Sequence, residues 1–202
     1  DPLYEIAAEH DLTIVEDAAC GAGASYDGEP VGSQFDASAF SFHPRKVLTT
    51  GEGGMITTND DELERTIRSI KNFGTDPSGD QPGFVRADAT NYRFSDILAA
   101  VGVAQLERAD EITERRREIA AVYDDLLGPV KGVDTPAVIE NGEHNYQCYC
   151  VYIEAGDDSL RDTLIDELGD ESIETQIGTY ALSETEAFGD ATQGSDLMTA
   201  KD

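Results

Sequence analysis

Ser41-Phe42-His43-Pro44-Arg45-Lys46 runs into Thr49-Thr50-Gly51-Glu52-Gly53-Gly54, so a lysine stands beside a glycine-rich turn. The residues before it, 37–42, form a short apolar run that is typical of a strand, and Pro44 ends such a strand. Lys46 is therefore expected on a loop just beyond a strand end, where scaffolds often carry reactive groups. The chain has only four lysines, which favours a functional role for this one. The alternative is an ordinary solvated loop lysine.

A second pattern precedes this loop. Residues 12–15, Leu-Thr-Ile-Val, read as a buried strand that runs directly into Glu16-Asp17-Ala18-Ala19. The carboxylates would then lie at the carboxyl end of a strand, where α/β sheets bind ligands. A carboxylate for the pyridinium nitrogen and a lysine for the Schiff base are the two protein groups that pyridoxal phosphate (PLP) requires. The alternative for Asp17 is a helix-capping or solvated acid.

Four segments together resemble the DegT/DnrJ/StrS family of PLP-dependent sugar aminotransferases. They are Val15-Glu16-Asp17-Ala18-Ala19, Ser41-Phe42-His43-Pro44-Arg45-Lys46, Thr50-Gly51-Glu52-Gly53-Gly54 and Asn91-Tyr92-Arg93-Phe94-Ser95-Asp96. Each segment alone would be a weak signal, but their order and spacing both match the family. The similarity runs from residue 1 to about residue 182 and then fades.

The resemblance implies an α/β protein with the aspartate-aminotransferase-like fold of type I PLP-dependent transferases. In that fold a large domain with a mostly parallel sheet carries the cofactor, and a small α/β domain closes over it. Residues 1–128 would be the second part of the large PLP-binding domain, and residues 129–202 would start the small domain. Family chains are much longer and supply further cofactor contacts from their amino-terminal part, so the sequence is interpreted as an internal fragment of a longer protein.

The function that the resemblance implies is the transfer of an amino group, from glutamate, to a nucleotide-linked keto sugar for amino-sugar or cell-surface polysaccharide biosynthesis. One alternative is a catalytically incomplete fragment that acts as a dimerisation or scaffold domain. A PLP-dependent sugar dehydratase is less favoured, because relatives of that type replace the lysine with histidine and Lys46 is present here.

The resemblance also assigns roles to five residues. Lys46 would form the Schiff base and move the substrate proton, and Asp17 would pair with the pyridine nitrogen. Ser41 would contact the cofactor phosphate, and Asn91 would reach the phosphate of the neighbouring subunit across a homodimer with shared active sites. Cys20 stands near the ring hydroxyl, where the family usually has glutamine or histidine. A strand-end role for Ser41 and a turn-shaping role for Asn91 are the alternatives.

Two further positions depart from the family. Gln147 and Ser183 stand where histidines are common in relatives, in the region that meets substrate. Substrate specificity therefore does not transfer from the family to this chain.

Periodicity and capping residues predict the remaining elements. A helix is expected from Pro2, a strand at 55–58, a helix after a cap at Asn59, a helix from Ser95, and a longer helix ending at Leu127. Beyond a linker at 130–142, we expect strands at 145–153 and 172–177 and a helix at 158–168.

Composition limits the partners. There are 42 acidic and 14 basic residues, and the net charge is −28. Such a charge argues against binding to nucleic acid or to an anionic membrane, since both need positive charge on the protein. The acids are dispersed along the chain, as expected for a protein of a high-salt cytoplasm. Three cysteines without paired spacing, no signal peptide and no long apolar run predict a reduced, cytoplasmic, soluble protein with no metal site.

We predict that the melting temperature rises steeply with salt. At about 0.1 M salt the screening length is about 10 Å and at about 1 M it is about 3 Å, so repulsion among the acids falls as salt is added. Circular dichroism melting in KCl measures this effect, and a melting temperature that does not change with salt would refute the halophilic interpretation.

Overall fold

The computed structural model describes residues 2–76, 78, 83–154 and 159–180. The chain divides into two compact units. The first comprises Asp1–Leu126 and Ala137–Tyr149, and the second comprises Leu127–Pro136 and Cys150–Asp202. Residues 137–149 therefore cluster with the first unit, beyond the boundary expected at residue 128. The assignment of the units to a large and a small enzyme domain stays a prediction.

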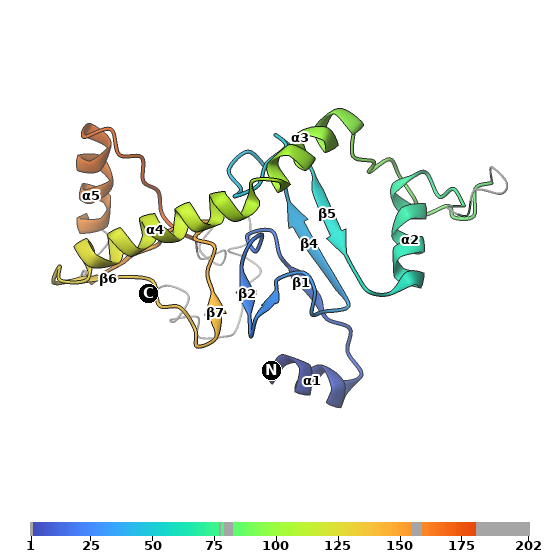
Figure 1. Ribbon diagram of the computed structural model, residues 1–202, viewed down its shortest axis with the longest axis horizontal. Helices are drawn as coiled ribbons and strands as arrows, with labels where there is room; N and C mark the ends of the chain where they lie inside the picture. Colours follow the sequence, from blue (N-terminus) through green and yellow to red (C-terminus); the bar gives the residue numbers. More distant parts are fainter. Residues whose placement is uncertain (1, 77, 79–82, 155–158, 181–202) are drawn as a thin grey trace. The chain divides into compact units, whose positions relative to one another are not determined.

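The first unit is built on a mixed sheet of three strands in the order β1-β4-β5 (Figure 1). β1 (Val15–Asp17) pairs in parallel with β4 (Ala37–Ser41), and Asp17 lies opposite Ala39. β5 (Gly54–Thr57) pairs antiparallel with the other side of β4. The expected strands at 37–42 and 55–58 are thus confirmed within one residue.

The expected buried strand at 12–15 is wrong in its position and burial. The strand begins only at Val15, and Leu12 and Val15 are 58% and 69% exposed. Ile14 N–H donates to Asp36 Oδ2 at 2.7 Å, so a side chain takes the place of a strand partner. Of the apolar run, only Val15 pairs in the ladder, opposite Ala37, and Glu16 and Asp17 continue it.

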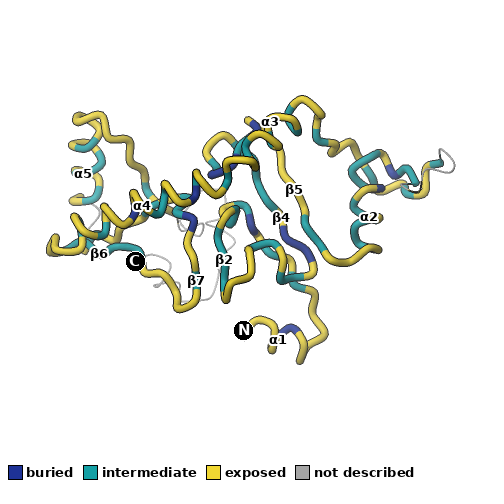
Figure 2. Tube along the Cα trace, viewed as in Figure 1, coloured by how far each residue is buried: buried dark blue, intermediate teal, exposed yellow. Residues whose placement is uncertain are grey.

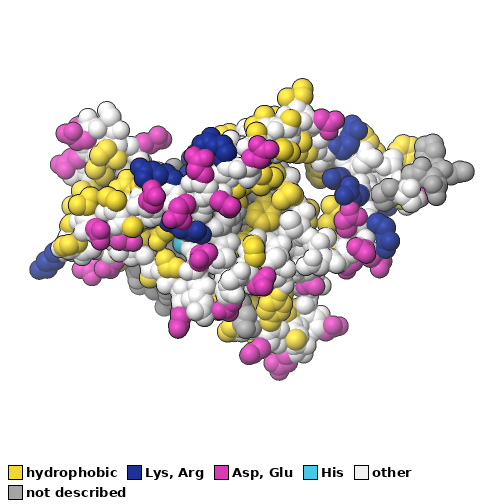
Figure 3. All heavy atoms as spheres, viewed as in Figure 1, with side chains coloured by type: hydrophobic (Ala, Val, Ile, Leu, Met, Phe, Trp, Pro, Cys, Tyr) yellow, Lys and Arg dark blue, Asp and Glu magenta, His cyan; other side chains and the backbone are white. Residues whose placement is uncertain are grey.

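Buried residues of β4 and of the two loops that follow β1 and β4 pack together. Ala37 and Ser38 on β4 are buried, and so are Ala18 after β1 and Val47 and Leu48 after β4 (Figure 2). The core of the first unit therefore includes both loops that follow the parallel strands. Acidic side chains are spread over the face shown in Figure 3 and form no single patch there.

Helices follow the predicted starts closely. Ser95 caps its helix as expected, and its Oγ accepts from Leu98 N–H at 3.2 Å. The cap of the preceding helix is Asp60, one residue after the expected Asn59, and its Oδ1 accepts from the N–H groups of Glu62 and Leu63. The helices of the first unit are α1 (Pro2–His10), α2 (Asp61–Lys71), α3 (Asp96–Leu106) and α4 (Ala109–Leu127, whose last residue falls in the second unit).

The loop between β4 and β5 is closed by backbone hydrogen bonds and aromatic packing. Phe42 N–H donates to Gly53 O at 2.8 Å, and Thr50 N–H donates to Phe42 O at 3.1 Å. The rings of Phe42 and Phe94 lie 6.1 Å apart. The glycine-rich segment and the segment that carries Phe94 are therefore parts of one packed loop base.

The remaining strands are short. In the first unit β2 (Ser25–Tyr26) pairs with β3 (Glu29–Pro30) and β7 (Gly142–Glu143). In the second unit β6 (Val133–Asp134) pairs antiparallel with β8 (Tyr152–Ile153), and α5 covers Ser159–Asp170.

The long strand expected at 145–153 is wrong, because only β8 forms. Tyr146 has φ +47°, a left-handed conformation that interrupts an extended strand. The strand expected at 172–177 is also wrong: Ser172 has φ +63°, Ile173 N–H closes the preceding helix on Leu168 O, and residues 173–177 form no strand. Ser183 lies outside the described residues.

Within the described ranges, no helix is both long and apolar enough to cross a bilayer. The same part of the chain holds no group of three or more His, Cys, Asp or Glu side chains placed to bind a metal ion.

We predict that Gly53→Ala destabilises the fold more than Gly51→Ala. Both glycines have positive φ, +140° and +87°, so each alanine costs backbone strain of about 1–2 kcal/mol. A Cβ at Gly53 would also lie 2.3 Å from the Phe94 ring, whereas at Gly51 nothing lies within 4 Å. The clash adds roughly 1–3 kcal/mol. Denaturant unfolding in high salt measures the difference, and equal losses would contradict the packing of Phe94.

Candidate functional site

The parallel pairing of β1 and β4 brings two strand ends to one edge of the sheet. Asp17 is the last residue of β1, and Ser41, two residues beyond the partner of Asp17, is the last residue of β4. The carboxyl edge of parallel strands is the usual ligand side of an α/β sheet. The loops that carry Cys20 and Lys46 both start from this edge.

Alternation along β1 separates the roles of its two acids. Glu16 Oε2 accepts from Ser38 Oγ at 2.6 Å and from Gly32 N–H at 3.0 Å, so this carboxylate holds the sheet together. Asp17 points to the other face and is exposed. Its Oδ1 accepts from Ala19 N–H at 3.0 Å, which fixes the turn that follows. Of the two acids, Asp17 is the one available to a ligand.

Lys46 and Cys20 meet across the edge. Lys46 is half-buried, and its Nζ donates to Cys20 Sγ at 2.9 Å. The backbone N–H of Lys46 donates to His43 O at 2.9 Å, which sets the lysine in a tight turn. The amine of the loop after β4 thus contacts the thiol of the loop after β1, although the two residues are 26 positions apart in sequence.

Ser41 and His43 lie at the root of the lysine loop. Ser41 Oγ accepts from His43 N–H at 3.3 Å, and His43 Nδ1 accepts from Arg45 N–H at 3.3 Å. The imidazole therefore caps the loop. Both side chains are half-buried.

Asn91 makes its contacts in the structure with residues other than these groups. It is exposed, forms a β-bridge with Asn72, and its Oδ1 accepts from Arg93 Nε at 3.1 Å. Its described contacts are thus with the chain around the end of α2. The role predicted for it at a neighbouring subunit stays a prediction.

The groups at the edge fit the chemistry of PLP. A primary amine, a carboxylate and a neutral hydroxyl are the types of group that this cofactor needs for its aldehyde, its ring nitrogen and its phosphate. Lys46, Asp17 and Ser41 supply one of each at the carboxyl edge of the β1–β4 pair. An apolar cavity of about 760 Å³ lies between β4, β5, α2 and α3, and Leu48 and Thr49 of the lysine loop line it, but Lys46, Asp17 and Ser41 do not.

Two residues that the sequence did not assign to the site hold both loops. Asn145 is only 2% exposed, and its Nδ2 donates to Cys20 O at 2.7 Å and to Ala22 O at 2.8 Å. Gln147 Oε1 accepts from Val47 N–H at 2.7 Å. A lone asparagine and a lone glutamine give no periodic or motif signal. The sequence therefore singled out only Gln147, and only because histidine is common at its position in the family.

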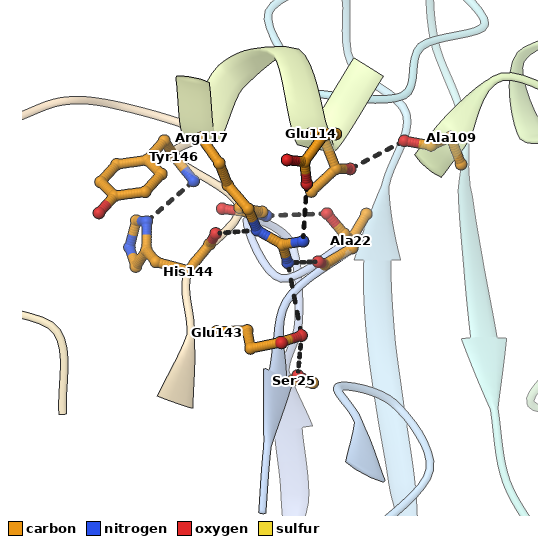
Figure 4. A network of polar contacts seen from close by, with 11 residues as sticks. Ala22, Ser25, Ala109, Glu114, Arg117, Glu143, His144 and Tyr146 are labelled. Carbon is orange, nitrogen blue, oxygen red and sulfur yellow. Dashed lines mark hydrogen bonds and ion pairs between the residues drawn. The ribbon is translucent and has the colours of Figure 1, made fainter. Parts of the chain in front are cut away.

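Arg116 and Arg117 of α4 hold the segment that carries these two amides, and Figure 4 shows the contacts of Arg117. Arg117 Nε donates to His144 O at 3.0 Å, and its Nη2 donates to Gly23 O at 3.1 Å. Arg116 Nη1 donates to Tyr146 O at 2.9 Å. The 144–147 segment is therefore tied both to α4 and to the loop after β1.

Comparison with known proteins identifies a family to which the sequence is similar. The model of the DegT/DnrJ/EryC1/StrS aminotransferase family matches residues 1–202. GDP-perosamine synthase from Caulobacter vibrioides is 40% identical over 177 residues, which are 87% of this chain and 47% of that protein. DesV from S. venezuelae, solved in complex with a ketimine intermediate, is 31% identical with a TM-score of 0.85 over 98% of this chain and 52% of DesV.

Spr1654 from Streptococcus pneumoniae, solved in a PLP form, is 27% identical, with a TM-score of 0.82 over 93% of this chain and 48% of its own. The expected mixed α/β fold of PLP aminotransferases is confirmed over about half the length of such structures. The chain likewise spans about half the length of the curated relatives it matches.

We predict that Asn145→Ala lowers the free energy of unfolding by about 2 kcal/mol. The substitution removes the hydrogen-bond partner of the Cys20 and Ala22 carbonyls and of Gln147 N–H. Asn59→Ala is the matched control, since Asn59 is exposed and makes one 3.3 Å bond to Ser33 O. Its loss should stay below about 0.5 kcal/mol. Denaturant titration compares the two, and similar losses would contradict the role of Asn145.

Proposed function

Since this chain belongs to the DegT/DnrJ/EryC1/StrS aminotransferase family, we propose that it carries the lysine-bearing part of a PLP site that transfers an amino group to a nucleotide-linked keto sugar. The observation that carries the proposal is the meeting of Lys46 and Cys20 at the edge where Asp17 and Ser41 end their strands. An amine at the ligand edge of the sheet is the group that transamination needs.

Lys46 is proposed as the group that holds the cofactor aldehyde and, once released, carries the proton to and from the substrate carbon. When bound, PLP supplies an electron sink for the carbanion that deprotonation leaves. The contact of Lys46 Nζ with Cys20 Sγ keeps the amine at the edge of the sheet. A neutral amine is the form that accepts the proton.

Asp17 is proposed to pair with the pyridine nitrogen and keep it protonated, and its exposure on the ligand side supports that role. Ser41 would donate its hydroxyl to the phosphate, and Cys20 would lie near the ring. A thiol is a weak hydrogen-bond partner, so the ring hydroxyl would be held less firmly than by an amide.

The substrate class rests on relatives. GDP-perosamine synthase and UDP-4-amino-4-deoxy-L-arabinose–oxoglutarate aminotransferase are among the similar proteins, and both names contain a nucleotide-linked amino sugar. We accordingly propose glutamate as the donor and a cell-surface polysaccharide precursor as the product. We also propose that the protein forms a homodimer in which Asn91 contacts the cofactor phosphate of the neighbouring subunit. We further propose that it works in a cytoplasm of high salt.

The proposal predicts that PLP labels Lys46. The chain is incubated with PLP in high-salt buffer, its absorbance is recorded, borohydride is added to fix any imine, and the peptides are mapped by mass. Lys46 should carry the label, and Lys46→Ala should abolish it while Lys71→Ala leaves it unchanged. An unlabelled wild-type chain would refute a working site here and favour the dimerisation or scaffold alternative.

We predict further that Asp17→Asn slows the reaction with glutamate by about 100-fold or more, because a neutral amide no longer stabilises the charged ring nitrogen. PLP labelling of Lys46 should persist. Asp27→Asn, at an exposed turn residue, is the matched control. The spectral change of the bound cofactor on adding glutamate measures the rate, and an unchanged rate would remove Asp17 from the site.

A further inference from the structure

We infer that Gln147 is a positioning residue for Lys46, an inference that rests on the proposed role of the Lys46 amine. The side-chain amide of Gln147 bonds the two peptide groups on either side of the lysine. Its Oε1 accepts from Val47 N–H at 2.7 Å, and its Nε2 donates to Arg45 O at 2.5 Å. One side chain therefore fixes the backbone both before and after Lys46.

These two bonds complete the restraint on the lysine backbone. Lys46 N–H already donates to His43 O at 2.9 Å. Val47 and Leu48, which follow, are buried. Because the peptide groups on both sides of Lys46 are held, the torsion angles of its side chain are what remain free to rotate. The side-chain amine reaches Cys20 Sγ.

The chemistry of the contact selects an amide. An amide carries a donor and an acceptor at the end of one side chain, which matches a carbonyl and an N–H presented together by the loop. A carboxylate would keep the bond to Val47 but place an oxygen against Arg45 O. Asparagine is one methylene shorter and would not reach both groups.

The position of Gln147 is itself set by the loop after β1. Gln147 N–H donates to Asn145 Oδ1 at 3.0 Å, and the Nδ2 of the same asparagine donates to Cys20 O and Ala22 O. The 145–147 segment thus holds the Cys20 loop with one amide and the Lys46 loop with the other. The relative placement of Cys20 and Lys46 depends on this shared support.

The contacts of Gln147 give it a role beyond the sequence-based expectation, which placed it only in the region that meets substrate and stays a prediction. Its oxygen and its nitrogen each bond the lysine loop. Gln147 also lines a cavity of about 460 Å³ together with Tyr146 and Tyr149. The polar end therefore serves the loop.

The test compares Gln147→Ala with Gln34→Ala. Gln34 is also a half-buried glutamine whose Nε2 donates to a backbone carbonyl, Tyr26 O at 3.1 Å, away from the lysine loop. Melting in high salt first checks that each variant folds. Amide hydrogen exchange then reports the protection of Val47 N–H without cofactor, and PLP with borohydride reports the labelling of Lys46 relative to Lys71.

Gln147→Ala should lower the protection of Val47 by about five- to ten-fold, the effect of losing one hydrogen bond. It should also slow the labelling of Lys46 without changing Lys71, and Gln34→Ala should change neither. Unchanged labelling in a folded Gln147→Ala chain would overturn the inference, whether or not protection falls.

Gln147→Glu keeps the inference testable if the alanine variant does not fold. It retains the acceptor for Val47 and loses the donor to Arg45, so protection of Val47 should stay near wild type while labelling of Lys46 still slows. Labelling at the wild-type rate would overturn the inference. A wild-type chain that takes no label would refute the proposed function instead, and Val47 protection alone would then show whether the clamp on the loop exists.

Discussion

The parallel pairing of β1 with β4 is the constraint on which the site depends. It places Asp17, the last residue of β1, and Ser41, the last residue of β4, at the same edge of the sheet. The loops after both strands therefore start from the same edge. An antiparallel partner would have put the second loop at the opposite edge. β5, which is antiparallel to β4, carries the chain away from the edge and leaves room for the long loop that holds Lys46.

Local signals predicted the parts of this arrangement that depend on neighbouring residues. The strand before Lys46, the glycine turn after it and the cap at Ser95 follow from side-chain size, glycine conformation and hydroxyl capping. The sequence predicted that Lys46 lies on a loop just after a strand, and in the structure its loop follows the end of β4. The fold class followed from the resemblance, because order and spacing of motifs carry topology.

The sequence did not predict contacts between residues far apart. Asn145 and Gln147 bond backbone groups more than 90 positions away, and a backbone carbonyl or N–H has no residue identity that a pattern can match. The same segment misled the strand prediction. Alternating aromatic and apolar residues favour a strand, but Tyr146 has a positive φ, and the amides on either side of it bond the two loops. Long-range polar contacts thus overrode a local preference.

The strong negative charge of the chain affects ligand binding as well as folding. PLP and a nucleotide sugar are both anionic, and a protein of net charge −28 would repel them at low salt. At about 1 M salt the screening length falls to about 3 Å, so that repulsion acts only at contact distance. Binding would then depend on the groups proposed to touch the ligand, which at this edge are the Lys46 amine and the Ser41 hydroxyl. Salt that stabilised the acidic fold, as we predict, would therefore also allow an anionic ligand to approach it.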